Sequence, residues 1–428
     1  MKKSITSILV AHVVFTLISC VSCSDEVAWP DTPTVKTERG DDNPYKVPLS
    51  EALRDAENLM HSLDGVRTRN ARVVSQVEYV LSQDIQTRSP EGIDTLLYVV
   101  SYGEDEGFAI LGADKRMPSV YAIANEGNIC LADTSDNPGL AMFMDNVRTS
   151  IGVFPGYFPG DSIGWKPIEP VDPGFGDRQV TYLKQIRPML SKYASRWGQY
   201  APFNRSCWFG SGSAYCAVGC VPLACAQIMS FYKWPLSYKS NILSWQDWND
   251  WYDASPTAIE SYCPYGLQVF LRDIGVTLEA DYGSINTGVL LDQLKSHFHD
   301  FGYEPIGNQS PLKHSTASVA LEKTPILVFG EATSESDVNH TWVIDGYLSY
   351  KEVWDAIANP NHTIFRHMYH CVWGYMGKNN GYFLCSDGGV MGTSPFSYDE
   401  NDLEESDSRL QGKSFQELVY FSNFKPVR

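Results

Sequence analysis

A stretch dense in proline and glycine, from Phe154 to Gly176, constrains the fold of this 428-residue chain more than any other feature. Its prolines are Pro155, Pro159, Pro167, Pro170 and Pro173. Proline lacks a backbone N–H and glycine weakens helices and strands, so such a composition cannot hold regular structure. We therefore expect an exposed, protease-accessible linker between two domains.

The part before the linker has the pattern of a small α+β domain. Apolar residues recur at helical spacing from Leu49 to Leu63 and again around Leu140 to Val147. Strand-like runs lie between them, at Leu96 to Tyr102 and Phe108 to Gly112, joined by a glycine- and acid-rich turn. The larger part begins near residue 180.

The first residues of the chain predict export. Lys2 and Lys3 precede a short apolar run from Ile8 to Ile18, the pattern of a signal peptide. The run ends in Leu-Ile-Ser-Cys, which resembles the lipobox of bacterial lipoproteins, so we expect Cys20 to be lipidated, with Cys23 as second choice. A plain secretory signal is the alternative. The acidic and proline-rich residues that follow indicate a flexible tether.

Charge and cysteine spacing exclude several classes of function. The formal net charge of −18 argues against nucleic acid as a partner, because phosphate binding needs a basic surface. Apart from the N-terminus, no apolar run is long enough to span a membrane. The chain has ten cysteines, and the eight outside the signal region contain no CxxC pair, so we expect no zinc site, and disulfide pairing stays open. We expect no cofactor.

Cys220 is the candidate nucleophile. It lies where a glycine-flanked loop meets the apolar segment CVPLACAQIM, whose spacing is helical. Pro222 is tolerated only in the first turn of such a helix, so the helix should begin near Cys220. The unpaired N–H groups and the positive end of the helix dipole at that position favour a thiolate. The alternative is a small buried cysteine.

A cysteine nucleophile needs a base and oxyanion donors. His340 opens an alternating strand pattern, HTWVIDG, after a polar loop, and it is the preferred base, with His370 in a later strand as the rival. Gln199, upstream in WGQYAPFN, offers side-chain N–H groups that, with the Cys220 backbone N–H, would form an oxyanion hole. The pairs at His297/His299 and His367/His370 lack a completing cysteine or carboxylate cluster, so we expect no metal.

A tryptophan-rich segment, WQDWNDW at 245–251, has two interpretations. It is either a platform for stacking sugars or a set of half-buried packing residues, and the second is favoured.

Taken together, these segments resemble the streptopain family of papain-fold cysteine peptidases, of the Bacteroidetes type. The matching pieces occur in the family's order: WGQYAPFN, GCVPLACAQIM, DYG, PILVFG, HTWVIDGY and HCVWGYMGKNNGYF. The segment GFAILGADKRMPSVYAI, at 107–123, is similar to that family's inhibitory prosegment.

The resemblance implies an α+β, papain-like fold with a helical subdomain and an antiparallel sheet or barrel subdomain, preceded by a small α+β prodomain. It implies Cys220 as nucleophile, His340 as general base and acid, and Gln199 as oxyanion donor, while Trp373 would pack beside the histidine. The activity implied is hydrolysis of protein or peptide substrates through a thioester. The prosegment would be an intramolecular inhibitor, and an activating cut would fall in the linker.

The chain departs from the family pattern after its last histidine-containing strand. The family's Asn-Trp-Gly-Trp-Gly-Gly is Val-Trp-Gly-Tyr-Met-Gly here, at 372–377. Val372 cannot hydrogen-bond an imidazole, and Tyr375 and Met376 are expected to reshape the wall of the cleft.

The sequence thus predicts five regions: a lipoprotein signal peptide at 1–23, a tether at 24–48, an inhibitory prosegment at 49–153, a linker at 154–178 and a catalytic domain at 179–428. The protein is expected to be exported, either lipid-anchored to the bacterial cell envelope or secreted, and to meet the membrane only through its lipid. Two alternatives are a catalytically impaired surface-binding protein of the same fold and a cysteine amidase that acts on cell-wall peptides.

Overall fold

The computed structural model describes residues 46–64, 72–81, 95–103, 105–115, 117–132, 137–152, 175–209, 214–283, 287–331, 339–356, 359–386, 391–392 and 418–428. All of them belong to one compact unit, Asp42–Arg428. The signal peptide, Cys20, most of the tether and residues 154–174 of the linker lie outside these ranges, as does residue 153. Within the described ranges, no helix is both long enough and apolar enough to cross a membrane.

The prosegment folds as two helices and a four-stranded antiparallel meander. Its elements are α1 (Leu49–Asp64), β1 (Val74–Leu81), β2 (Thr95–Tyr102), β3 (Phe108–Gly112), β4 (Val120–Ala124) and α2 (Pro138–Gly152). Helix α1 forms because its apolar residues recur every three or four positions and are buried together on one face. The two helices and the two strands predicted from periodicity are therefore confirmed.

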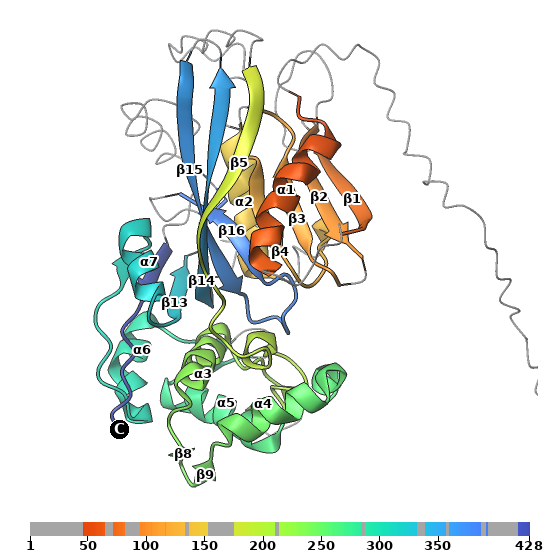
Figure 1. Ribbon diagram of the computed structural model, residues 1–428. Coiled ribbons are helices and arrows are strands. Elements are labelled where there is room, and N and C mark those ends of the chain that lie inside the picture. Colours follow the sequence, from red (N-terminus) through yellow and green to blue (C-terminus); the bar gives the residue numbers. More distant parts are fainter. Residues whose placement is uncertain are drawn as a thin grey trace, which may run out of the picture. The chain divides into compact units, whose positions relative to one another are not determined.

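The catalytic region contributes the rest of a large antiparallel sheet. Its strands are β5 (Phe175–Ile186), β12 (Ser310–Pro311), β13 (Ile326–Gly330), β14 (His340–Ala356), β15 (Asn359–Val372), β16 (Gly381–Cys385) and β17 (Leu418–Phe421). The order is β1-β2-β3-β4-β16-β15-β14-β13-β17-β12. One edge of β14 is shared, because β13 pairs with its first residues and β5 with its later ones. The long strands β5, β14 and β15 lie side by side in Figure 1.

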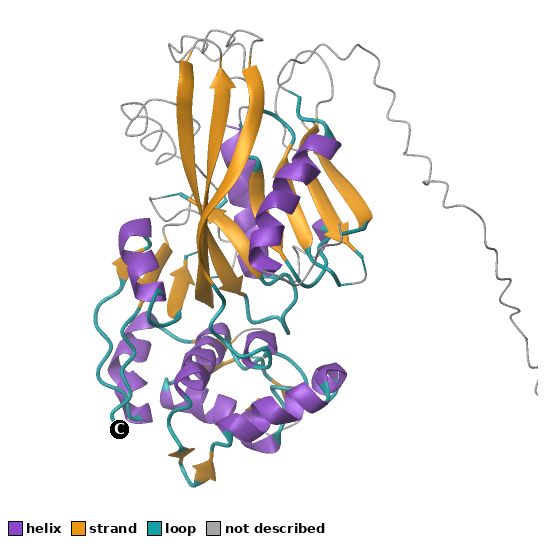
Figure 2. Cartoon of the chain, viewed as in Figure 1, coloured by secondary structure: helices purple, strands orange, loops and turns teal. Residues whose placement is uncertain are grey.

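The remaining helices and small hairpins lie between β5 and β13 in the chain. They are η4 (Ala194–Arg196), β6 (Trp208–Phe209), β7 (Ala214–Tyr215), α3 (Cys220–Tyr232), β8 (Ser237–Tyr238), β9 (Asn241–Ile242), α4 (Trp245–Ala254), η5 (Pro256–Glu260), α5 (Tyr265–Thr277), β10 (Asp281–Tyr282), β11 (Thr287–Gly288), α6 (Leu291–His297), η6 (Phe298–Phe301) and α7 (His314–Leu321). Helices α3, α4 and α5 gather in one region around a second apolar core (Figure 2). The helical and sheet subdomains of the expected fold are both present.

The tryptophans of α4 serve packing. Trp245 and Trp248 are buried, with ring centroids 5.2 Å apart, and the Trp245 indole N–H donates to the carbonyl of Pro235. Trp251 is half-buried and its ring lies 5.5 Å from that of Tyr193. These side chains therefore do not form an open platform for sugars.

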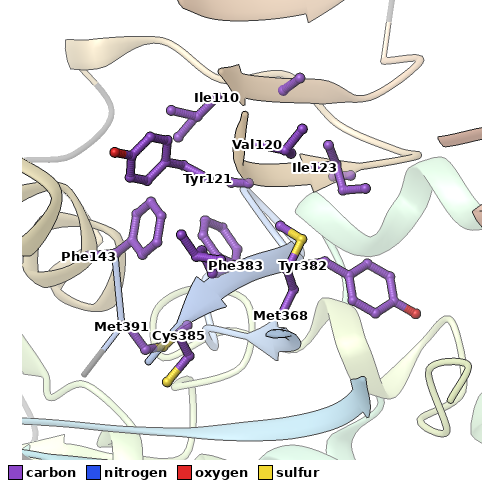
Figure 3. Close-up of a cluster of buried hydrophobic side chains, with 14 of the residues drawn as sticks. Ile110, Val120, Tyr121, Ile123, Phe143, Met368, Tyr382, Phe383, Cys385 and Met391 are labelled. Carbon is purple, nitrogen blue, oxygen red and sulfur yellow. The ribbon is translucent and has the colours of Figure 1, made fainter. Parts of the chain in front are cut away.

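The prosegment and the catalytic region share one sheet and one core, which the sequence did not predict. Strand β4 pairs with β16, with Ala122 opposite Phe383 and Ile123 opposite Tyr382. Phe143 of α2 packs edge-to-face on Phe383, their ring centroids 4.9 Å apart. Figure 3 shows this mixed cluster, in which side chains from β3, β4 and α2 meet those from β15 and β16. Separating the two parts would therefore expose apolar surface on both.

Buried charges also cross from the prosegment to the catalytic region. Glu352 of β14 accepts two hydrogen bonds from Arg366 of β15, at 3.0 and 2.8 Å, and it also accepts the backbone N–H of Ser119 at 2.7 Å. Arg178 of β5 donates to Asp55 of α1, at 3.2 and 2.8 Å. All four charged side chains are almost fully buried. Because an unpaired buried charge is costly, the Arg178–Asp55 pair favours the joined state over the separated one. The Glu352–Arg366 pair lies within the catalytic region, and its link to the prosegment is the hydrogen bond from Ser119.

Strand β5 begins inside the stretch that was expected to lack regular structure. Residues from Phe175 onward pair with the far half of β14, and the side chain of Arg178 is buried. The exposed edge of β14 supplies hydrogen-bond partners that local composition does not reveal, so tertiary pairing overrides the weak local preference for a strand.

Candidate active site

Cys220 is the first residue of α3, as predicted. The preceding Gly219 has φ +94°, and a Cβ there would lie 3.0 Å from Cγ2 of Thr287 and 3.2 Å from Cδ of Pro222, so only glycine fits this turn. The residues from Val221 to Met229 are buried, whereas the Cys220 thiol is half-buried. The helix therefore presents its first side chain at a surface and anchors the others in the core.

The environment of the thiol contains opposing effects. Burial raises the pKa of Cys220, while interactions with the backbone and side chain of Thr341 and with the backbone at Val221 lower it. Burial dominates, so the thiol is neutral in this state. Cys225, further along α3, is fully buried and cannot act in its place.

His340 is the first residue of β14 and is buried. Its Nε2 lies 3.0 Å from the carbonyl oxygen of Trp373, so this nitrogen carries the proton and donates it. The ring stacks on Trp342, with centroids 5.9 Å apart and planes 17° apart, and Tyr375 lies on another side at 5.8 Å. Burial lowers the pKa of His340 to about 4, with the bond to Trp373 opposing the change, so the imidazole is neutral.

The structure places the thiol and the imidazole on opposite faces of the start of β14. Successive side chains of a strand point to opposite sides. Trp342 lies in the core shared with the prosegment, whereas Val343 lies in the core around α3. Cys220 interacts with Thr341, the residue directly after His340, while the His340 ring is hydrogen-bonded to Trp373. No hydrogen bond joins Cys220 to His340 in the described part of the chain, so the two candidate residues are not paired in this structure.

The prosegment contacts the candidate base directly. Gly139 is the second residue of α2, and a Cβ there would lie 2.2 and 2.5 Å from Cε3 and Cζ3 of Trp373 and 3.1 Å from Cδ2 of His340. Asn137 caps this helix, because its Oδ1 accepts the N–H of Leu140 at 3.2 Å. The first turn of α2 thus covers His340, and only glycine permits so close an approach.

Gln199 lies beside the loop that leads to Cys220. Its side chain is buried, and its backbone carbonyl accepts the N–H of Val218 at 2.8 Å. The preceding Gly198 forms a bridge with Tyr375. Gln199 is therefore held between the loop that leads to Cys220 and the segment that follows Trp373, and within the described residues no hydrogen bond joins its side-chain amide to Cys220.

Trp373 is fully buried and fixed at several points. Its indole N–H donates to the carbonyl of Asn379 at 3.0 Å, and its backbone N–H donates to Oδ1 of Asn380 at 3.2 Å. Asn380 in turn donates to the carbonyl of Ser195 at 2.9 Å. These bonds hold the Trp373 carbonyl in place to receive His340.

The residues that depart from the family pattern pack in two ways. Val372 is buried opposite Val343 in the core around α3, so it offers the imidazole nothing polar. Met376 has φ +58°, and its N–H donates to the carbonyl of Trp197 at 3.3 Å. Its Cγ lies 2.6 Å from where a Cβ of Gly198 would be, so the methionine covers the backbone next to Gln199.

The rival base, His370, has a structural partner instead. Its Nδ1 lies 2.6 Å from Oδ1 of Asp345, whose other oxygen accepts the N–H groups of Met189 and Leu190 at 3.0 and 2.9 Å. This pair ties the segment after β5 to the sheet. Across the described ranges, no group of three histidine, cysteine or acidic side chains is arranged to hold a metal.

Sequence reasoning missed several residues of the site. The carbonyl of Trp373 orients His340, but a backbone group has no sequence signal. Gly139 and Thr341 come close to the dyad only through tertiary packing. The HTWVIDG motif contains Thr341 and Asp345, so their positions, though not their roles, could have been marked from the sequence.

Comparisons with known proteins agree with this architecture. The peptidase C10 family matches residues 197–383, and the Spi protease inhibitor family matches residues 45–151. The thiol protease/hemagglutinin PrtT of Porphyromonas gingivalis is 24% identical over 347 residues, 73% of this chain and 36% of PrtT, so the chain spans about a third of that relative. Streptopain of Streptococcus pyogenes is 20% identical over 337 residues, 68% of this chain and 74% of streptopain.

Among solved structures, a prointerpain A fragment from Prevotella intermedia has a TM-score of 0.45 and 15% identity, covering 80% of this chain and 97% of that one. Active interpain A has a TM-score of 0.36 and 17% identity, covering 56% and 95%. By the two family matches, residues 197–383 are similar to the peptidase C10 family of cysteine proteases, and residues 45–151, ahead of them, are similar to the Spi protease inhibitor family.

Proposed function

We propose that the protein is a cysteine endopeptidase made as a latent zymogen, with Cys220 as nucleophile and His340 as base and acid. The observation that carries this proposal is the meeting of two elements: the start of α3, which presents the thiol, and the start of β14, which supplies His340. The first turn of α2 packs on the imidazole and accounts for latency.

The proposed chemistry is acyl transfer. When α2 leaves, His340 turns from Trp373 toward Cys220 and takes its proton. The thiolate attacks the peptide carbonyl carbon, and the oxyanion is held by the side-chain N–H of Gln199 and the backbone N–H of Cys220. Protonated His340 gives its proton to the leaving amine as the C–N bond breaks. Water, deprotonated by His340, then cleaves the thioester and restores the thiol.

Activation requires more than opening the site. The prosegment is held by strand pairing, a shared core, the buried Arg178–Asp55 pair and the hydrogen bond from Ser119 to Glu352, as well as by α2. A cut in the linker would end the covalent connection and leave these contacts intact. We therefore propose that the nicked prosegment stays bound until it is degraded or displaced.

Export and lipid anchoring at Cys20 are further parts of the proposal and rest on the sequence of the first residues. Metabolic labelling with a radioactive fatty acid tests the anchor. Label is expected on the wild-type chain and absent from Cys20→Ala, whereas label that persists on this variant would contradict lipidation at Cys20.

Alkylation of the processed protein tests the proposed nucleophile. One equivalent of an epoxysuccinyl probe or iodoacetamide should label Cys220, as mapped by mass spectrometry, because six of the other described cysteines are buried and only Cys130 is similarly accessible. Cleavage of casein should be lost on labelling. Labelling without casein cleavage but with turnover of cell-wall peptides would favour an amidase, and absence of both activities would favour a binding protein.

Replacing Gly139 with valine should weaken latency. The new side chain overlaps Trp373 and His340, and such overpacking costs about 1–3 kcal/mol, so self-processing of the proform should become roughly ten- to a hundredfold faster. The rate is measured by gel densitometry. Ala141→Val is the matched control, because it adds a β-branched residue at a half-buried position of the same turn. Equal rates for both variants would contradict the role given to Gly139.

Replacing Met376 with glycine should allow cleavage of peptides that carry a larger residue directly after the cut, on the side of the leaving amine. Met376 covers Gly198 beside the oxyanion donor, and its neighbour Tyr375 contacts His340, which protonates the leaving amine. Cleavage of peptides with a bulky residue after the cut should rise about tenfold in kcat/KM, while small residues there change little. Met376→Leu is the control, and a uniform change across the peptide series would contradict this placement.

A further inference from the structure

The hydroxyl of Thr341 is a buried polar group without an evident role. Thr341 is 2% exposed, and its Oγ1 has no hydrogen-bond partner with full geometry in the described ranges. A buried hydroxyl without a partner costs free energy, so such an atom calls for an explanation.

Thr341 lies against the candidate nucleophile. Both its backbone and its side chain interact with the Cys220 thiol, and both interactions lower the pKa of that thiol. Helix α3 packs on β14, and Thr341 is on the face of the strand turned toward that helix, as the burial of Val343 in the core around α3 shows. The free hydroxyl and the thiol are therefore neighbours.

We propose that Thr341 is a positioning residue for the nucleophile, whose hydroxyl and backbone N–H donate to the Cys220 sulfur and hold it at the start of α3. This inference rests on the proposed function. Two successive residues of one strand then have complementary tasks: His340 moves the proton, and Thr341 stabilises the sulfur from which it is taken. No other residue type of similar size supplies both a methyl group for packing and a hydroxyl donor.

The arrangement matters most in the latent state. The His340 ring is held by Trp373 there and gives the thiol no support. Thr341 maintains the position of the sulfur meanwhile, so that return of the imidazole completes the pair without moving α3. Among the described titratable groups, Cys225, which is buried on α3, interacts with the thiol, whereas the His340 ring lies on the other face of β14, bonded to Trp373.

The test follows the rate of Cys220 alkylation by iodoacetamide against pH, on the protein after linker cleavage and release of the prosegment, with the site mapped by mass spectrometry. Thr341→Val keeps the shape and removes the hydroxyl. Its alkylation midpoint should move up by about one pH unit, since a hydrogen bond to a thiolate is worth on the order of a tenfold change in ionisation. Thr341→Ser should restore the wild-type midpoint, and kcat should fall in Thr341→Val with little change in KM.

Thr287→Val is the matched control. Thr287 is also buried beside the start of α3, but its hydroxyl donates to the carbonyl of Ala217 at 2.7 Å, so its loss should leave the midpoint unchanged. An unchanged midpoint in Thr341→Val, or a shift that Thr341→Ser does not reverse, would overturn the inference. Failure of the proposed function is seen separately, as wild-type protein in which Cys220 is not alkylated or Cys220→Ala retains activity.

Discussion

Replacing Cys220 with alanine is expected to remove casein cleavage and self-cleavage of the linker together, by roughly 10⁴-fold or more. The thiol is the atom that forms the covalent bond, and no other described cysteine is placed to substitute for it. Cys225 is fully buried and Cys207, Cys216 and Cys263 are buried in the same core. Turnover is measured with casein, and self-cleavage by N-terminal sequencing of the products of the purified proform.

The matched control is Cys225→Ala, on the same helix. It removes a buried thiol, so it should lower stability modestly and leave the rates within a few-fold of wild type. A linker cut between about 154 and 180 that appears at the wild-type rate in Cys220→Ala would show that another protease makes it. Casein cleavage by that variant would contradict Cys220 as the nucleophile.

Lowering the pH from 6.5 to 4 is expected to favour dissociation of the prosegment from His340 by roughly 80-fold, and the limit over the whole titration is about 300-fold. In the latent state burial lowers the pKa of His340 to about 4, from an ordinary value of 6.5 that it regains when solvated. The latent state therefore binds fewer protons than the open one across this window. The contribution of His340 to the stability of the latent state is fully present well above pH 6.5. It falls as the pH drops through this window and is lost well below pH 4.

The measurement uses a proform that carries Cys220→Ala, so that it cannot process itself. The linker is cut once by an added protease, and dissociation of the nicked prosegment is followed by size-exclusion chromatography at each pH. His340→Gln is the control, because glutamine does not titrate while every other group, including the stacked pair His314 and His367, still does. If dissociation of the nicked prosegment depends on pH equally in the two proteins, His340 is not the group responsible.

These two predictions concern the same feature, the burial of Cys220 and His340 in the latent state. Burial keeps the imidazole neutral, and a neutral imidazole turned toward Trp373 cannot take the proton of Cys220. Burial also keeps the thiol protonated. Both halves of the dyad are thus held in their uncharged forms by the same packing, and solvent entry on release of α2 would favour the charged pair.

Much of the local structure follows from residue spacing. The helical repeat predicts α1, α2 and α3, and Gly219 with Pro222 defines the start of α3 at Cys220, because each residue restricts the backbone locally. Alternation likewise predicts the start of β14 at His340. The limit of this reasoning is shown by β5, which begins within the proline- and glycine-rich stretch because β14 offers it an edge.

Whether candidate residues work together is a different matter. The sequence marked Cys220, His340, Gln199 and Trp373, but their identity says nothing of which way the imidazole points. That direction depends on the carbonyl of Trp373 and on the close approach of Gly139, about two hundred residues away along the chain. Contacts between such distant segments depend on packing that neither segment encodes alone.

By itself, then, the sequence determined where α3 begins, and it predicted which residues carry the chemistry and that an inhibitory prosegment precedes them, because backbone restriction and residue chemistry are local properties. Only the tertiary structure decided that the prosegment shares a sheet and a core with the protease region, that His340 is turned away from Cys220, and that Thr341 faces the thiol. The reason is physical: these outcomes depend on burial and on strand pairing between distant segments, and both arise only when the whole chain packs.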